Sequence, residues 1–364
     1  MKKTVSVFVI VFFSSILVLS IVLGYLYELN WVGVIDTATG EIKSLWDWLE
    51  LLIVPLILAI GGWWISHVEK LRSQNLKDTE VLVLVEKQRQ DSLQKYIDDM
   101  TSLLLGNITD EWDEDDIILN AVIISQTLAT LKMLDGTRKG ILLQFLCDLG
   151  LISIEKNPQT QHFGSLDIRM ADLSNANLNG CRLYGVRLME VNFSGATFYS
   201  ATFYGSDLWQ SNFTAADLTY SEFISARMVD STFQDTKMIR SNASDLVLTR
   251  AKISNSVFNN SLLHEASFKN AKIAQTAFAH CILNGADFSD ATLNKVDFSN
   301  ADLSPWVEGK RTSFRNSKLV DVNFDNADLT GADFTDAQID LRSIKKAKTL
   351  TGVILPNGNA LAEN

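Results

Sequence analysis

A period of five residues dominates the second half of the chain and restricts the folds available to it. Counted from Ser165, a large apolar residue recurs at every fifth position, with a small residue two positions before it. The large residues begin with Leu173, Leu178, Leu183, Leu188 and Phe193, and the small ones with Ala171, Ala176, Cys181 and Val186. This period matches neither a helical turn of about 3.6 residues nor the alternation of a strand. We therefore predict a stacked coil that turns each large side chain inward.

The repeat closely resembles the pentapeptide-repeat family, whose motif A(D/N)LXX occurs literally in this chain. The literal copies include Ala171-Asp172-Leu173, Ala176-Asn177-Leu178, Ala216-Asp217-Leu218, Ala301-Asp302-Leu303 and Ala327-Asp328-Leu329. The resemblance covers roughly half of the chain. It implies an all-β fold, a right-handed quadrilateral β-helix with four pentapeptides in each coil. The small residues are needed because the interior must also hold the Leu and Phe side chains.

Two apolar runs ahead of the repeat predict a pair of transmembrane α-helices. Residues 4–27 are long enough, at about 1.5 Å per residue, to cross a hydrocarbon core of roughly 30 Å, and a second run covers about residues 49–65. Basic residues flank the pair, whereas the connecting loop is acidic. Because positive charge stays inside, we expect both termini in the cytoplasm and a two-pass protein of the bacterial inner membrane, with the lipid bilayer as a partner. The alternatives are a cleaved signal peptide and a buried hairpin of a soluble protein.

A small α-helical segment is expected between the membrane and the repeat. Charged, helix-favouring sequence extends from Ser66 to about Leu105, and further helices are expected over residues 117–134 and 138–149. The predicted domains are a hairpin over 1–66, a helical segment over 67–158, the repeat over 159–345 and a C-terminal cap over 346–364. Residues 96–104 and 131–140 resemble the helical segment of bacterial membrane proteins that join a hairpin to a pentapeptide repeat.

The start of the last predicted helix holds a possible anion site. Thr137, Arg138 and Lys139 would place two basic side chains beside the free N–H groups of a helix N-terminus, which attract phosphate. The alternative is that these side chains are simply solvated. No carboxylate, histidine or nucleophile of fixed spacing accompanies them, so such a site would be regulatory rather than catalytic.

Two departures from the period are informative. Phe314 follows Leu303 by one residue too many, and the sequence around Trp306 has no clean repeat. A loop is expected there, either as a tolerated surface insertion or as a partner-binding loop. Ala243 is too small for its position and Leu246 too large, so we predict that the two exchange volume in one interior.

The composition provides no set of residues for catalysis. The four histidines are dispersed, no two of the three cysteines have metal-ligand spacing, and nucleotide-binding motifs are absent from the sequence. Most Asp residues precede a large apolar position and are expected to face solvent. We therefore expect no enzyme activity, no metal and no cofactor, and reduced cysteines in the cytoplasm. The net charge of −11 argues against nucleic acid as a partner.

Residues twenty apart should stack on one side of the coil, which converts the sequence into a map of the surface. Tyr184, Tyr204 and Ile224 form one outward column, and Met189 and Trp209 belong to its neighbour. We expect these columns to be covered by the helical segment or by another subunit, because exposed aromatic columns favour contact. The complete candidate interaction surface is Tyr184, Met189, Tyr204, Trp209, Ile224, Val257, Leu262, Ile282 and Trp306.

Two classes of function remain. The first is a membrane-anchored, non-catalytic scaffold or interaction module that binds a cytoplasmic protein or assembles as a homo-oligomer, as solenoids commonly do. The alternative is a membrane effector in defence or stress response, whose oligomerisation through the repeat perturbs the bilayer. A DNA-mimic inhibitor of topoisomerase, known among soluble pentapeptide-repeat proteins, would need a more acidic rod.

Overall fold

The computed structural model describes residues 34–35, 42–43, 45–106, 114–153 and 166–361. The chain divides into two compact units, Met1–Leu84 and Val85–Asn364. In the first unit, β1 (Val34–Ile35) pairs antiparallel with β2 (Ile42–Lys43). Helix α2 (Leu45–Gly106) follows, begins in the first unit and ends in the second.

The predicted transmembrane spans receive no support from the described residues. The run over 4–27 lies outside them, and residues 49–65 are helical as part of α2. Among the helices that the structure describes, none combines the length and the apolar character needed to cross a bilayer. Helix α2 instead continues without a break into a stretch that contains Glu69, Lys70 and Arg72.

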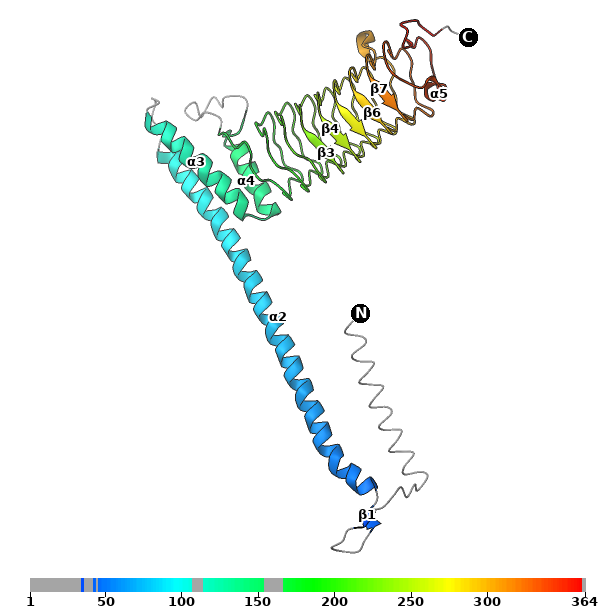
Figure 1. Ribbon diagram of the computed structural model, residues 1–364. Helices are drawn as coiled ribbons and strands as arrows, with labels where there is room; N and C mark the ends of the chain where they lie inside the picture. The colour runs from blue at the N-terminus through cyan, green and yellow to red at the C-terminus, as the bar shows by residue number, and fades with distance from the viewer. Residues whose placement is uncertain (1–33, 36–41, 44, 107–113, 154–165, 362–364) are drawn as a thin grey trace. The chain divides into compact units, whose positions relative to one another are not determined.

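The second unit begins with a small helical layer (Figure 1). The C-terminal part of α2 packs with α3 (Glu114–Met133) and α4 (Gly136–Asp148), as the sequence predicts. Leu93, Tyr96 and Met100 of α2 are buried, and the Tyr96 hydroxyl lies 2.6 Å from Thr127 Oγ1 of α3. Apolar residues at three- and four-residue spacing explain this contact, because they share one face of each helix.

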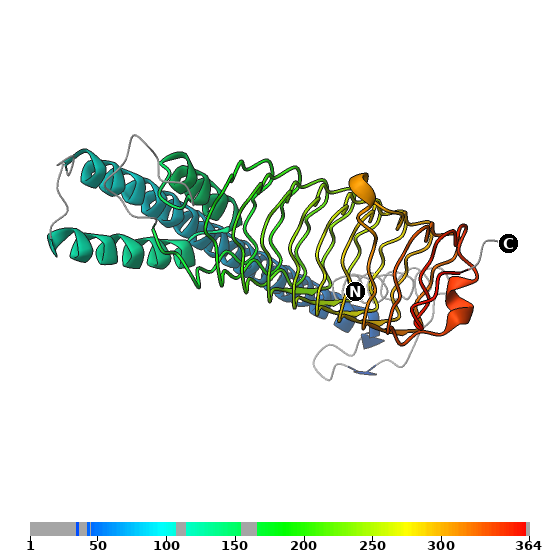
Figure 2. The same cartoon turned by 90° about the horizontal axis from the view of Figure 1, so that it is seen from above.

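The repeat is a β-solenoid, which confirms the predicted stacked coil. Bridges join residues twenty apart, for example Asn177 with Thr197 and Thr197 with Asp217, so four pentapeptides make one coil. Five short strands extend the ladder on one side into a parallel sheet, in the order β3-β4-β5-β6-β7. Their bounds are β3 Thr232–Gln234, β4 Lys252–Ser254, β5 Lys272–Ala274, β6 Thr292–Asn294 and β7 Lys318–Val320. Figure 2 shows the successive coils side by side.

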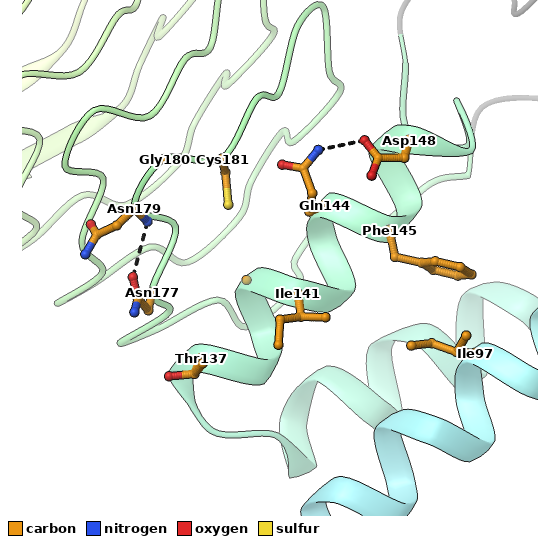
Figure 3. A pocket seen from close by; sticks show the side chains of 11 residues that line it. Ile97, Thr137, Ile141, Gln144, Phe145, Asp148, Asn177, Asn179, Gly180 and Cys181 are labelled. Carbon is orange, nitrogen blue, oxygen red and sulfur yellow. Dashed lines mark hydrogen bonds between the residues drawn. The ribbon is translucent and has the colours of Figure 1, made fainter.

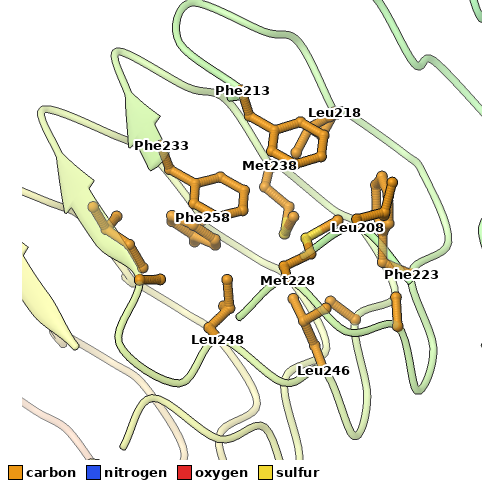
Figure 4. Packing of buried hydrophobic residues seen from close by; sticks show 14 of the residues in the cluster. Leu208, Phe213, Leu218, Phe223, Met228, Phe233, Met238, Leu246, Leu248 and Phe258 are labelled. Carbon is orange, nitrogen blue, oxygen red and sulfur yellow. The ribbon is translucent and has the colours of Figure 1, made fainter. Parts of the chain in front are cut away.

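The interior is made by the two predicted positions of each pentapeptide. The large residues stack in columns, so that Phe213 lies 5.2 Å from Phe193 and 5.0 Å from Phe233 between ring centroids. Figure 4 shows part of this core, in which Met228 and Met238 take the central positions of two sides. Ala243 and Leu246 are both fully buried, so Leu246 does not point outward at a bulge.

Hydroxyl groups at the small positions join one coil to the next. The Ser231 hydroxyl donates to the Leu208 carbonyl at 3.0 Å and accepts from the Ser211 N–H at 3.0 Å. Ser206 and Ser256 donate in the same way to carbonyls of the preceding coil. A buried serine is therefore compatible with the apolar interior, because its polar atom is satisfied by the backbone.

The corners of the coil require a left-handed backbone at one residue in each pentapeptide, two positions after the large residue. This residue is a glycine at some corners, such as Gly180 and Gly185, and Asn175 or Asp230 at others, all with φ between 54° and 69°. Gly, Asn and Asp adopt this conformation at low cost, which explains their recurrence at the corners.

The C-terminal segment covers the last coil. Helix α5 (Leu341–Ile344) ends the regular repeat, and Thr349 and Ile354 then bridge to Asp328 and Asp333 of the coil before them. Ile354 also forms an antiparallel bridge with Ala360. This return of the chain satisfies the hydrogen-bonding edge that an open solenoid would expose.

Candidate interaction surface

Helix α4 closes the first coil of the repeat by taking the place of a preceding coil (Figure 3). The Asn177 N–H donates to the Gly136 carbonyl at 2.7 Å. The Gln144 side chain accepts from the Arg182 N–H at 2.9 Å and donates to the Arg182 carbonyl at 3.4 Å. These bonds satisfy edge groups of the first coil that would otherwise lack a neighbour.

The close approach of α4 depends on glycine. A Cβ added at Gly136 would lie 2.0 Å from the Asn175 carbonyl oxygen, and one at Gly140 would lie 2.0 Å from that of Asn177. These two residues are one helical turn apart, so they lie on the same face of α4. We call this pair, which lets the helix backbone approach the coil, the glycine track.

The N–H groups and basic side chains at the N-terminus of α4 already have partners, so the structure shows neither an open anion site nor simply solvated side chains. The Asp135 carboxylate accepts from the N–H groups of Thr137 and Arg138 at 3.0 and 3.2 Å. Arg138 pairs with Asp135 and, at 2.7 Å, with Glu86. Lys139 is buried and donates to the Ser174 carbonyl at 3.0 Å. Asp135 is the N-cap, so its negative charge fills the position that a phosphate would take.

Two open pockets lie along the junction of α4 and the first coil. One has a volume of about 540 Å³ and includes Ile97, Ile141 and Phe145. The other, of about 640 Å³, includes Tyr184, and both are lined by Gln144 and Asp148. Gln144 donates to Asp148 at 2.7 Å, so the carboxylate has a partner already. The lining is therefore suited to contact rather than to acid–base chemistry.

The cysteines at this junction lack the properties of a nucleophile. Burial raises the pKa of the Cys147 thiol to about 11, and burial also raises the pKa of Cys181. Cys281 is buried in the interior as expected, with a pKa raised by burial to about 12. The reactive form of cysteine is the thiolate, which these environments disfavour. In the described part of the chain, no group of three His, Cys, Asp or Glu residues could hold a metal ion.

The predicted columns are in register on one side of the solenoid, which we call the tyrosine side. The inward residues of this side include Leu183, Phe203 and Phe223. The residue after each of them stands at the corner that follows, and these corner residues form a line that we call the corner column: Tyr184, Tyr204, Ile224, Ser244 and His264. Backbone bonds fix the stacking, with the Gly185 N–H donating to the Tyr204 carbonyl and the Gly205 N–H to that of Ile224, both at 2.9 Å.

The helical segment leaves the first residues of the corner column open. Tyr184 and Tyr204 are 54% and 52% exposed, and Ile224 is half-buried. Met189 and Trp209 are half-buried at the next corner, where the Trp209 indole donates to Asp230 at 3.3 Å. Of the two coverings expected for the tyrosines, the helices that the structure describes do not supply one. Coverage by another protein or subunit stays a prediction.

The outward residues of the tyrosine side form a second line, the side column. It consists of Arg182, Thr202, Glu222, Asn242, Leu262, Ile282 and Asp302, each bridged to the next. Leu262 and Ile282 are 37% and 38% exposed, and Val257 lies half-buried on the preceding side. Five of the nine predicted surface residues thus belong to the tyrosine side or to its following corner.

The insertion near Trp306 folds back onto this corner rather than standing free. Bridges on either side of it join residues 26 apart, as in Thr292 with Lys318, so the coil contains six extra residues. The Trp306 ring stacks on His264 with centroids 4.2 Å apart, and Lys310 pairs with Glu265 at 2.8 Å. Part of the extra chain is the 3-10 turn η1 (Val307–Gly309). Trp306 therefore adds an aromatic ring to the corner column.

The sequence map missed one aromatic group at the corner that precedes the tyrosine side. Tyr199 and Tyr220 are 54% and 41% exposed, and their ring centroids lie 5.3 Å apart. Arg240 donates to the Tyr220 hydroxyl at 2.7 Å. The two tyrosines are 21 residues apart, so a rule that stacks residues twenty apart does not pair them. Both corners of the tyrosine side therefore carry exposed aromatic rings.

Comparison with known proteins identifies the repeat. Family models described as pentapeptide repeats match residues 178–222, 273–304 and 310–340. Comparison with curated proteins gives no match.

Solved structures with detectable likeness include HetL, a pentapeptide repeat protein involved in heterocyst differentiation regulation from the cyanobacterium Nostoc. It is 20% identical, with coverage of 53% of this chain and 91% of HetL, and a TM-score of 0.38. Another is QnrB1, a plasmid-mediated fluoroquinolone resistance protein, at 20% identity, 47% and 89% coverage and a TM-score of 0.33. The residues that the family models match therefore contain pentapeptide repeats, and the twenty-residue register makes the repeat region a β-solenoid.

Proposed function

We propose that this protein is a non-catalytic interaction module whose solenoid binds another protein through the tyrosine side. The observation that supports this most directly is the pair of half-exposed tyrosines, Tyr184 and Tyr204, stacked in register one coil apart. Large rigid aromatic side chains provide much of the binding energy at protein interfaces. A surface of this kind is well suited to a partner that lies along the rod.

The backbone beneath these side chains also supports the proposal. Each tyrosine follows a buried residue of the tyrosine side, Leu183 or Phe203, and bonds between coils fix the corner. Binding would therefore immobilise little backbone, which reduces its entropic cost. Similar solenoids commonly present such faces to partners.

We also propose, from the sequence, that the protein is attached to a bilayer. The apolar run over residues 4–27, preceded by Lys2 and Lys3, supports it. This attachment would present the solenoid to partners at the membrane surface.

Site-specific photo-crosslinking tests the interaction. A benzophenone amino acid replaces Tyr204 in one variant and Tyr184 in another, and the intact chain is irradiated in its own cells. The matched control carries the same group at Gln234, an exposed residue of β3 on the opposite side of the coil. We expect discrete crosslinked species from both tyrosine positions and not from the control. Equal crosslinking at all three positions, or none at the tyrosines, would contradict the proposal.

A further inference from the structure

We infer that the partner of the tyrosine side is the tyrosine side of a second copy of this chain, with the two repeats antiparallel. This inference rests on the proposed function and names its partner. The charge pattern of the side column is the first argument. Arg182 stands at the N-terminal end, whereas Asp302, stacked on Asp328, stands at the C-terminal end. The residues between these ends are uncharged except for Glu222.

The charged side chains at the two ends of the side column are not paired within the described part of the chain. Among the described residues, neither the Arg182 guanidinium nor the Asp302 carboxylate has an ion-pair partner. The bonds from Gln144 to Arg182 reach its backbone and not its guanidinium, and the Asp302 carboxylate accepts one N–H, from Ser304 at 3.1 Å. Among the described residues Asp302 therefore lacks an ion-pair partner, so a cation supplied from outside would stabilise its carboxylate.

Only an antiparallel arrangement matches these charges. Consider a two-fold axis that is perpendicular to the rod and lies at the level of Asn242. This axis places Arg182 of one copy opposite Asp302 of the partner. Six bridges separate the two residues, or about 29 Å at a spacing of about 4.8 Å. Because the axis is two-fold, the contact forms twice. Parallel rods would instead set Arg182 against Arg182 of the partner, and like charges suppress association.

The corner column supports the same axis independently. The Trp306 ring stacks on His264, and a Cβ added at Gly285 would lie 3.0 Å from Trp306 Cβ, so Trp306 covers the coils of Leu263 and Leu283. The axis at Asn242 brings these two coils against the coils of Phe223 and Phe203 of the partner.

Trp306 of each copy therefore meets the corner that carries Tyr204 and Ile224 of the partner. Glu222 lies within one coil of the level of Arg240 of the partner, and the Arg240 guanidinium stands at the corner that precedes the tyrosine side. The same two-fold axis thus brings together both the exposed aromatic residues and the opposite charges. Tyr and Trp, which often dominate binding energy at interfaces, then lie between the charged ends.

Charge exchange tests the inference by sedimentation velocity on the intact chain over a concentration series. We expect a dimer whose dissociation constant rises about tenfold or more in Arg182→Glu and in Asp302→Arg, because each creates two like-charge contacts. The double variant should return to within about threefold of the unmodified chain, because the two changes are coupled across the interface. Arg187→Glu, an identical charge change on the next side of the same coil, is the control and should leave the constant unchanged.

Three results would overturn the inference: a chain that stays monomeric, association that neither single variant weakens, or a double variant no tighter than the single ones. Crosslinking distinguishes this failure from failure of the proposed function. A monomeric chain that crosslinks through Tyr204 to a different protein overturns the dimer and supports the interaction module. A monomeric chain without crosslinks at Tyr204 contradicts both.

Discussion

At the scale of single residues, the interior of the solenoid tolerates exchange of volume between neighbouring positions. Ala243 occupies a central position where other coils hold Leu or Phe, and Leu246 occupies a position where they hold Ala, Ser, Val or Thr. Both are fully buried in the same apolar core. The irregular pair therefore fits the packing and does not interrupt the register between coils.

We expect Leu246→Ala to lower the free energy of unfolding by about 2 to 5 kcal/mol, as a truncation that leaves a cavity. Adding Ala243→Leu should recover part of the loss, because the new side chain enters the emptied volume. Urea unfolding of the intact chain, followed by the signal lost with the repeat, measures both variants. If the double variant is no more stable than Leu246→Ala alone, the two positions do not share volume.

A second prediction at this scale concerns pH. Burial raises the pKa of Tyr96 from 10.0 to about 12, although the hydrogen bond with Thr127 lowers it. The neutral phenol is favoured in the folded state, so its contribution to stability is full below pH 10 and is lost as pH rises through about 12. We expect the packing of α2 on α3 to weaken in that range, by about 3 kcal/mol at most.

Circular dichroism of the helical signal against pH measures this transition. Tyr96→Phe should abolish the part of the transition that belongs to this residue, although it also removes the bond with Thr127. An identical alkaline transition in Tyr96→Phe would show that other groups cause it.

At the scale of elements, α4 acts as the first layer of the solenoid. Its backbone carbonyl at Gly136 and the side-chain amide of Gln144 pair with groups that a preceding coil would satisfy in the middle of the repeat. The helical segment and the repeat are therefore joined by hydrogen bonds as well as by apolar contact, and Arg138 adds an ion pair to Glu86 of α2.

We predict that Gly140→Ala loosens this junction. The added methyl group would lie 2.0 Å from the Asn177 carbonyl, a backbone atom, so α4 must move away. The loss should be about 1 to 3 kcal/mol, as for overpacking, despite a gain of about 1 kcal/mol in helix propensity. Hydrogen exchange at the Asn177 and Arg182 amides, both bonded to α4, should become faster.

Thr137→Ala is the matched control, because Thr137 is exposed on the same helix. It should change stability by no more than about 0.5 kcal/mol. Unchanged exchange at Asn177 in Gly140→Ala would show that α4 is not held by the glycine track.

At the scale of the whole molecule, the repeat has a cap at each end, α4 and the C-terminal segment, and the proposed interaction surface lies on the repeat between them. The flanking charges of the apolar runs predict that both chain ends lie in the cytoplasm, with the loop between them outside.

Labelling with an impermeant thiol reagent tests this topology. The three native cysteines are replaced, and a single cysteine is placed at Thr37 or at Asn364. We expect labelling at position 37 in intact cells and protection at position 364 until the cells are opened. Protection at 37 with labelling at 364 would reverse the orientation, and recovery of the chain away from membranes would contradict the anchor.

The solenoid is predictable from the pattern of residues alone, because each pentapeptide places one large and one small residue inward whatever its neighbours are. Leu173, Phe203 and their equivalents are predictable for this reason, and so are the columns that contain Tyr184 and Tyr204. Local spacing is sufficient wherever contacts repeat at a fixed separation. The same regularity explains why the insertion at Trp306 was visible as a break in the period.

Contacts between residues of irregular separation depend on the three-dimensional fold and cannot be derived from the period. Thr137, Arg138 and Lys139 have the sequence of an anion site, but Asp135, Glu86 and the Ser174 carbonyl take up their polar groups. The stack of Trp306 on His264 and the pair of Tyr199 with Tyr220 likewise depend on how a loop folds back and how a corner turns. No period encodes such contacts, because they form between elements whose separation in the chain follows no repeat.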